Sequence, residues 1–564
     1  MVLIVKNMIK WLEKNHKSEV PVMDEFTYEK RFFDGYRFYD EMSGFMLSYA
    51  GVGEFDLAIC KERYSDSIDS ALKFMERVET QEVVNVSEGR RVDHFNLRLG
   101  EGLEKSITLW RTIQVDVEKI KSGQVVNENN QTYTDVIVNG IGGSYLGPYM
   151  ILIAKKGNDF NVGEKLPVKI HFVSNTDPES FYTLMEKLDL SRTIMVNISK
   201  SGSTAETAGN LEAFHNLLTD KGLTPGRHNI TVTTPGSPFD KYSQEQKFMH
   251  IYPMNVETGG RTSVGSAVGM VPAAFGGLDF EQFLRGEAYM DELTRRKELR
   301  SNPALIISLI IHDAIQRVGH QNQIMLGYSD SLKEVAHYFQ QLFMESLGKN
   351  RDLNDTRDIE PTGLTIFGGV GTGEQHAFMQ QVQKGIQDAF VHFISFRKRK
   401  IDYDNKKAGS MGRQLLAFVE GTQQALRSNG REYISIVFEE QSEFNMGMLV
   451  ALEERVVVFL AGMWEINPFD QPGVQDGKLS ADSHNKLSLE IENKLPELAP
   501  FEGTAHDIAK ALGIGVEEAP RIEAIVNDIE GNINVPGAYP ALKGINIKRT
   551  WNGINCFIFT INRG

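Results

Sequence analysis

The chain has 564 residues and a mass of 63.4 kDa, a length that predicts about three or four domains. Hydrophobic residues make up 41% and charged residues 24%, so the chain can bury several cores and is not disordered. Its formal net charge of −15 disfavours binding to nucleic acids. The two cysteines, Cys60 and Cys556, exclude a disulfide framework and a thiolate zinc cluster.

The sequence predicts neither a membrane span nor a signal peptide. The longest apolar candidates, 263–278 and 456–464, are too short or too rich in glycine and serine for the roughly 20 apolar residues of a span. The N-terminus lacks the basic region of a signal peptide. We therefore expect a cytoplasmic protein without a membrane partner.

The order of elements predicts a helical cap over 1–105, followed by two α/β units. In the first unit, 106–295, short buried strands alternate with helices, which is typical of a parallel sheet. The second unit, 296–485, repeats this pattern after a helix at 303–318. The predicted strands are 135–139, 168–173, 193–198 and 230–233 in the first unit, and 324–327, 364–367, 433–437 and 456–459 in the second.

The remaining segment, 486–564, is a small appendage. Its pattern predicts two short helices, 505–512 and 516–529, followed by strands, which is compatible with a winged helix-turn-helix. Acids outnumber bases in this segment, so we favour a packing or assembly module over DNA binding. The sequence assigns it no role.

The segment Ser199–Glu206 follows a predicted strand and precedes a helix. Ser203 and Glu206 have the spacing of a capping box, which places the helix N-terminus on this loop. Free backbone N–H groups, the helix dipole, hydroxyl groups and one ammonium would then favour a small anion. An ordinary serine cap explains Ser203 but not the grouping of Ser199, Lys200 and Ser201, so we interpret the loop as a phosphate site.

Glycines also mark the end of the strand 135–139, in the loop Gly140–Gly147. A dinucleotide-binding fingerprint would need glycine where the chain has Tyr145. The loop is therefore interpreted only as a turn at which a ligand can approach the backbone.

Gln341 and Glu345 are four residues apart and share one face of a predicted helix. Most helical glutamates are solvated, but apolar residues flank Glu345, and a carboxylate in such surroundings can act as a base. His376 follows a glycine-rich turn at the end of a predicted strand, where α/β sheets hold ligands, although a lone histidine is more often structural.

Two further segments carry single cations, Arg261 after Gly259-Gly260 and Lys478 after 467–471. A loop with a solvated charge is the simpler interpretation of each segment alone. No group of histidines, cysteines or carboxylates has metal-ligand spacing, so we expect neither a metal nor another cofactor.

Taken together and in this order, the segments resemble those of the glucose-6-phosphate isomerase (phosphoglucose isomerase) family. The resemblance extends from about Asn85 to Lys478. It implies an α/β fold of two tandem sugar-isomerase (SIS) type parallel-sheet domains, with a helical N-terminal segment and a small C-terminal appendage. The segments that carry it are 85–94, 140–148, 341–346, 371–378 and 469–473.

The resemblance also implies an activity, the interconversion of glucose 6-phosphate and fructose 6-phosphate through ring opening and a cis-enediolate. Glu345 then resembles the base and Arg261 the arginine that stabilises the enediolate, while His376 and Lys478 resemble the pair that moves the ring-opening protons. The family's histidine comes from the neighbouring subunit, which implies a homodimer. The implied phosphate ligands are Ser199, Lys200, Ser201 and Thr204, and the implied sugar ligands are Gly143, Ser144, Gln341 and Gln471.

Two alternatives remain open from the sequence. The chain could be a non-catalytic sugar-phosphate-binding regulator built on the same domains. It could also be an isomerase that accepts mannose 6-phosphate, which differs from glucose 6-phosphate only at C2, a specificity that one sequence does not settle.

Overall fold

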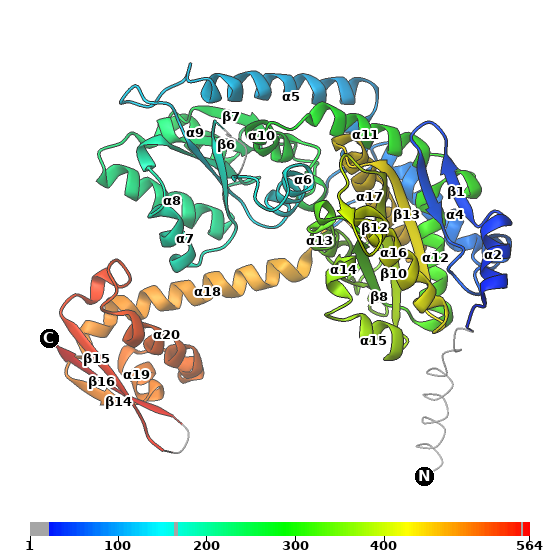
Figure 1. The fold of residues 1–564 in the computed structure, drawn as a ribbon. Coiled ribbons are helices and arrows are strands. Elements are labelled where there is room, and N and C mark those ends of the chain that lie inside the picture. The colour runs from blue at the N-terminus through cyan, green and yellow to red at the C-terminus, as the bar shows by residue number, and fades with distance from the viewer. Residues whose placement is uncertain (1–21, 163–166, 554–555) are drawn as a thin grey trace, which may run out of the picture. The chain divides into compact units, whose positions relative to one another are not determined.

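The structure is a computed structural model that describes residues 22–162, 167–553 and 556–564. The chain divides into two compact units, the first ending at Asp470 and the second comprising Gln471–Gly564. The first unit contains two α/β domains and the second is a small α/β unit (Figure 1). None of the helices in the described ranges is long and apolar enough to cross a membrane.

The first domain is built on a five-stranded parallel sheet with the strand order β4-β3-β5-β6-β7. Alternate side chains of β3 face opposite sides: Val136 and Val138 belong to the large core with α5, α6 and α10, and Ile137 packs with α7, α8 and α9. The strands are β3 (Asp135–Asn139), β4 (Lys169–Val173), β5 (Thr193–Ile198), β6 (Asn229–Thr233) and β7 (His250–Pro253). The helices are α5 (Gly100–Lys121), α6 (Leu146–Lys156), α7 (Pro178–Met185), α8 (Ala205–Asp220), α9 (Pro238–Glu245), α10 (Ala267–Gly276) and α11 (Phe280–Thr294).

The second domain has a six-stranded mixed sheet with the order β1-β2-β13-β10-β8-β9. Its last four strands are mutually parallel, and the β1–β2 hairpin pairs with β13 in the antiparallel sense. The N-terminal segment therefore contributes an edge hairpin to the sheet as well as the expected helices. The strands are β1 (Arg37–Asp40), β2 (Phe45–Ser48), β8 (Asn322–Gly327), β9 (Thr365–Val370), β10 (Ala389–Lys398) and β13 (Tyr433–Glu440).

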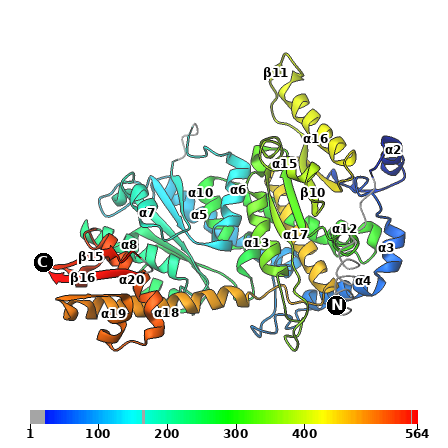
Figure 2. The same ribbon diagram turned by 90° about the horizontal axis from the view of Figure 1, so that it is seen from below.

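Helices cover both faces of this second sheet, with α12, α13 and α17 in the large core and α15 and α16 on the other face. The helix α16 projects from the sheet together with a short β11–β12 hairpin at Asp404–Ser410 (Figure 2). The helices of the domain and its N-terminal segment are α2 (Glu25–Phe33), α3 (Leu57–Arg63), α4 (Ser65–Glu79), α12 (Pro303–Val318), α13 (Val335–Leu347), α14 (Gly371–Glu374), α15 (Met379–Lys384), α16 (Met411–Arg427) and α17 (Glu443–Met463).

One predicted strand, 456–459, is wrong, because these residues lie inside the helix α17. Nearly every residue of this 21-residue helix is buried, so its apolar residues follow no helical stripe. A short apolar run does not by itself distinguish a buried strand from a buried helix. The strand that actually pairs with both β8 and β13 is β10, which the sequence analysis did not predict.

The C-terminal unit has the element order and strand order of a winged helix-turn-helix. A three-stranded antiparallel sheet, β14-β16-β15, packs with three helices around a core that includes Ile491, Ile525 and Phe559. The expected boundary between 485 and 486 falls within the first of these helices. The elements are α18 (Pro472–Lys494), β14 (Phe501–Gly503), α19 (Ala505–Leu512), α20 (Ala519–Asn532), β15 (Ile545–Trp551) and β16 (Phe557–Arg563).

The helix α20 occupies the place of the DNA-reading helix in winged-helix proteins. It carries Glu523, Asp528 and Glu530 against one base, Arg521. A surface of this charge repels phosphates. The charge of α20 therefore disfavours DNA binding, although the fold resembles that of DNA-binding units.

Candidate active site

The loops Gly140–Gly147 and Ser199–Thr204 both lie at the carboxyl ends of the parallel strands of the first sheet. β3 and β5 pair in parallel from Asp135↔Thr193 to Asn139↔Asn197, so the loops that follow both strands leave the same edge. The helix after the second loop, α8, begins at Ala205 and has Thr204 as its N-cap. The predicted capping box of Ser203 and Glu206 is wrong, because the cap lies one residue later and forms no side-chain hydrogen bond.

Hydrogen bonds within the loop Ser199–Thr204 fix its shape. The N–H of Gly202, which has a φ of +79°, donates to Oγ of Ser199 at 3.0 Å, and the hydroxyl groups of Ser201 and Ser203 are 2.6 Å apart. Lys200 donates from Nζ to the carbonyl of Thr258 at 3.2 Å. Burial, helped by the charge of Arg90, lowers the pKa of Lys200 to about 8. The loop thus presents hydroxyl groups and a half-buried lysine beside a helix N-terminus.

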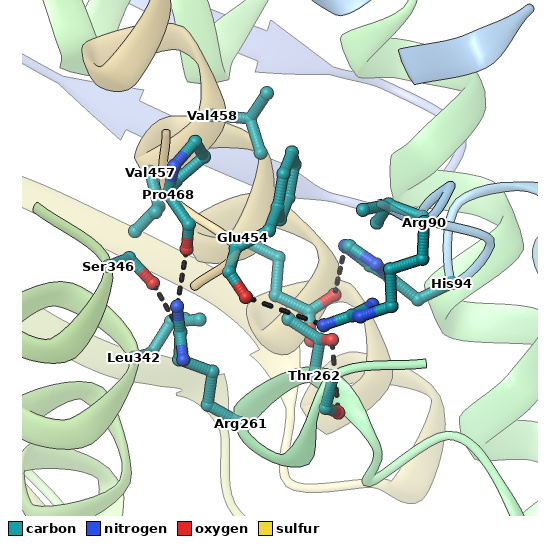
Figure 3. Close-up of a pocket in the computed structure, with 13 residues that line it drawn as sticks. Arg90, His94, Arg261, Thr262, Leu342, Ser346, Glu454, Val457, Val458 and Pro468 are labelled. Carbon is teal, nitrogen blue, oxygen red and sulfur yellow. Dashed lines mark hydrogen bonds and ion pairs between the residues drawn. The ribbon is translucent and has the colours of Figure 1, made fainter. Parts of the chain in front are cut away.

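Arg261 lies on the turn Gly260–Thr262 and is 4% exposed. Its Nε donates to Oγ of Ser346 at 2.7 Å, and its Nη2 donates to the carbonyls of Pro468 at 2.5 Å and Asp470 at 3.0 Å. Figure 3 shows the guanidinium held between Ser346 and Pro468. These contacts fix the plane of the cation from two sides.

Glu345, on α13, faces this guanidinium. Its Oε1 is 3.4 Å from Nη1 of Arg261, and 18% of its side chain is exposed. Gln341 lies one turn earlier on the same helix, and its Oε1 is buried without a hydrogen-bond partner among the described residues. The structure therefore confirms that Gln341 and Glu345 share a helix, and it brings the carboxylate against Arg261.

The loop Gly140–Gly147 packs directly against the turn that carries Arg261 and against the side chain of Gln341. A Cβ atom added to Gly143 would lie 2.0 Å from the carbonyl oxygen of Gly260, and one added to Gly142 would lie 2.9 Å from Nε2 of Gln341. The glycines are thus needed for packing between protein segments. Ser144, at the end of the same turn, is half-buried.

A cavity of about 20 Å³ is lined by Arg261 together with Arg90, His94 and Glu454 (Figure 3). It has room for about one water molecule and is too small for a hexose phosphate. Complete burial, followed by the charge of Arg98, holds the pKa of His94 well below its usual value, so His94 is neutral. Its Nε2 lies 3.9 Å from Oε2 of Glu454.

Of the other predicted site residues in the first unit, His376 lies outside this cluster. His376 follows α14 and is exposed, and among the described residues its side chain forms no hydrogen bond or ion pair. Gln471 and Lys478 belong to the C-terminal unit, where Gln471 is half-buried and Lys478 is an exposed residue of α18.

Three residues near Arg261 had no assigned role in the sequence analysis. Arg90 donates to the carbonyls of Glu257 at 3.1 Å and Phe469 at 3.4 Å, and its charge acts on the pKa of both Lys200 and Arg261. Lys349 and Asp470 form an ion pair of 2.9 Å. The available signal was their place in the chain: Arg90 and Asp470 lie inside segments that carry the resemblance, and Lys349 is four residues after Glu345.

The cluster can carry out proton transfer beside a carbonyl group. A carboxylate takes a proton from carbon, and a fixed cation next to it stabilises the negative charge that develops on oxygen. Within the described parts of the chain, no three side chains of His, Cys, Asp or Glu are grouped as metal ligands.

Comparisons with known proteins agree with this chemistry. The family model described as phosphoglucose isomerase matches residues 67–432. The chain is 34% identical to a glucose-6-phosphate isomerase from Prochlorococcus marinus, over 81% of this chain and 87% of the relative. It is also 34% identical to one from Gloeothece citriformis, over 89% and 94%.

Among solved structures, the chain is similar to a glucose-6-phosphate isomerase from Chlamydia trachomatis. The two are 26% identical with a TM-score of 0.72, and the match covers 86% of this chain and 95% of the other.

Proposed function

Because the chain belongs to the phosphoglucose isomerase family, we propose that it interconverts glucose 6-phosphate and fructose 6-phosphate. The observation that carries the proposal is the 3.4 Å approach of the Glu345 carboxylate to the Arg261 guanidinium. A regulator that only binds sugar phosphates needs the phosphate loop but has no use for this pair.

Glu345 acts as the base in the open-chain sugar. It takes the proton from C2, the electrons of the C2–H bond form the C1=C2 double bond, and the carbonyl electrons move to O1. Arg261 stabilises this enediolate because its guanidinium is already fixed where the charge develops. After a proton moves between O2 and O1, Glu345 returns its proton to C1 and the ketose forms.

The substrate is anchored by its phosphate at Ser199, Lys200, Ser201 and Thr204. Gln341 has a buried acceptor oxygen without a partner among the described residues, and a sugar hydroxyl group would satisfy it. Gly143, Ser144 and Gln471 complete the proposed sugar contacts. Anchoring at both ends of the hexose holds C1 and C2 against the base.

His376 and Lys478 move the protons of ring opening, with His376 supplied by the second subunit of a homodimer. The exposure of His376 fits a role outside its own protomer. The projecting helix α16 exposes Met411 (59%), Leu416 (52%) and Phe418 (41%), an apolar surface of the kind that oligomers bury.

The decisive experiment is isomerisation of fructose 6-phosphate in D₂O by wild type and by Glu345→Gln. We expect wild type to convert the sugar and to incorporate deuterium at C2 of the aldose. Glu345→Gln should lose both reactions while still binding the phosphate. Turnover or deuterium incorporation by Glu345→Gln would exclude Glu345 as the base.

A further inference from the structure

Lys349 lies two residues beyond the end of α13, and its ammonium contacts two other residues of the cluster. Nζ donates to the carbonyl of Glu345 at 3.0 Å and to the carbonyl of Asp470 at 2.7 Å. It also lies 2.9 Å from Oδ1 of Asp470. Lys349 is 8% exposed, so its ammonium is held among these protein oxygens, by two hydrogen bonds and one ion pair.

The carbonyl of Asp470 is a shared acceptor. It accepts from Lys349 and also from Nη2 of Arg261 at 3.0 Å. The carboxylate of Asp470 is fixed in turn, because Oδ2 accepts from the hydroxyl group of Ser87 at 2.6 Å. Asp470 therefore links Arg261, the cation beside Glu345, to Lys349, the cation that holds the main chain of Glu345.

We propose that Lys349 is a positioning residue. It fixes the position of the Glu345 carboxylate relative to the Arg261 guanidinium through its hydrogen bonds to the carbonyl oxygens of Glu345 and Asp470. The proposal rests on the roles of Glu345 and Arg261 proposed above. Lys349 acts through these residues and has no contact with the substrate in this scheme. Displacements of about 1 Å in such a pair reduce the rate about 10²-fold.

Charge balance supports the same role. Burial lowers the pKa of Lys349, and the carboxylate of Asp470 opposes this effect. Without the ammonium, Asp470 would be a half-buried anion near Arg261, since its charge also acts on the pKa of Arg261. The guanidinium would then be drawn toward Asp470 and away from Glu345.

The test replaces Lys349 by methionine, which keeps most of the length of the unbranched side chain and removes the charge and the donors. We expect kcat to fall about 10²-fold, while KM for fructose 6-phosphate stays within about threefold because the phosphate loop is unchanged. The control is Lys155→Met, which removes another partly buried ion pair, with Glu443 at 2.8 Å, and should leave both constants unchanged.

If Lys349→Met does not fold, the double variant Lys349→Met/Asp470→Asn removes the anion left unpaired. Its circular dichroism and size should match wild type, and its kcat should still be low because both carbonyls have lost the hydrogen bond from Lys349. A folded variant with normal kcat would overturn the proposal, as would a rise in KM without a fall in kcat.

Glu345→Gln is measured beside these variants to separate the two proposals. If Glu345→Gln is active, the assignment of the base is wrong. If it is inactive and Lys349→Met has the rate of wild type, only the positioning role is wrong.

Discussion

Lys200 donates a hydrogen bond to the carbonyl of Thr258, three residues before Arg261. This bond connects the loop Ser199–Thr204, the proposed phosphate site, to the turn that carries the proposed enediolate-stabilising cation. Nζ is half-buried there, and burial is the main reason that its pKa falls to about 8. The charge that would hold the phosphate is therefore present at neutral pH and lost in mildly alkaline solution.

This pKa predicts the pH dependence of substrate binding. Below about pH 8 the ammonium is charged and attracts the phosphate; above it the neutral amine does not, so KM should rise up to about tenfold between about pH 7 and pH 9. Steady-state kinetics with fructose 6-phosphate across this range would measure it. Lys200→Arg, which stays charged, should flatten the curve. A KM of wild type that is constant with pH would contradict this role of Lys200.

The fixed geometry of Arg261 predicts that charge alone is insufficient at this position. Arg261→Lys keeps the cation but loses the hydrogen bonds to Ser346 and to the two carbonyls, so we expect kcat to fall about 10²- to 10³-fold. KM should change little. Arg285→Lys, at an exposed ion pair with Glu281, is the matched control. Equal kcat values for the two variants would show that the clamp is unimportant.

The strands beside the proposed site were the most predictable part of the fold. β3 and β5 are short, wholly or almost wholly buried and followed by turn residues, so the sequence pattern and the structure agree there. β7 has four residues, lies at the edge and ends in proline. β10 begins with a buried run of apolar residues that His392 interrupts, so the continuous apolar run that marks β3 and β5 is broken there.

The site itself was predictable only in its parts. Motifs identified Gln341, Glu345 and Arg261, but local sequence does not encode that Arg261 donates to Ser346, Pro468 and Asp470, which are 85 to 209 residues away. Arg90 and Lys349 were missed for the same reason, since the contacts of Arg90 with Phe469 and of Lys349 with Asp470 are set by tertiary packing. His376 and Lys478 keep their sequence-based roles as proposals.

Glu453 predicts a pH dependence of stability that is unrelated to catalysis. It is fully buried on α17, neither carboxylate oxygen has a hydrogen-bond partner among the described residues, and burial raises its pKa to about 8. The folded state therefore binds a proton that the unfolded state releases near its ordinary pKa. Stability should fall as the pH rises from about 4.5 to about 8.

Glu453→Gln removes this titration. The difference in the free energy of unfolding between the variant and wild type should therefore favour the variant by a few kcal/mol more at pH 8 than at pH 5. Urea unfolding at both pH values measures the difference. The control is Glu439→Gln: ion pairing with Arg397 lowers the pKa of Glu439 to about 2, so its effect should be equal at the two pH values. A Glu453→Gln effect that is also equal at both would show that Glu453 is ionised in the folded protein.

We proposed that each active site receives His376 from the partner subunit. Two inactive variants should therefore restore each other's activity when they form mixed dimers. In a mixed dimer of Glu345→Gln and His376→Ala, the subunit with Glu345 receives His376 from its partner, so one complete site forms and the other lacks both groups. After subunit exchange, random mixing should restore about one quarter of the activity of wild type. The measurement is a coupled assay before and after mild dissociation, with each variant alone as the control. If His376 served its own subunit, every site would lack one group and the mixture would stay inactive.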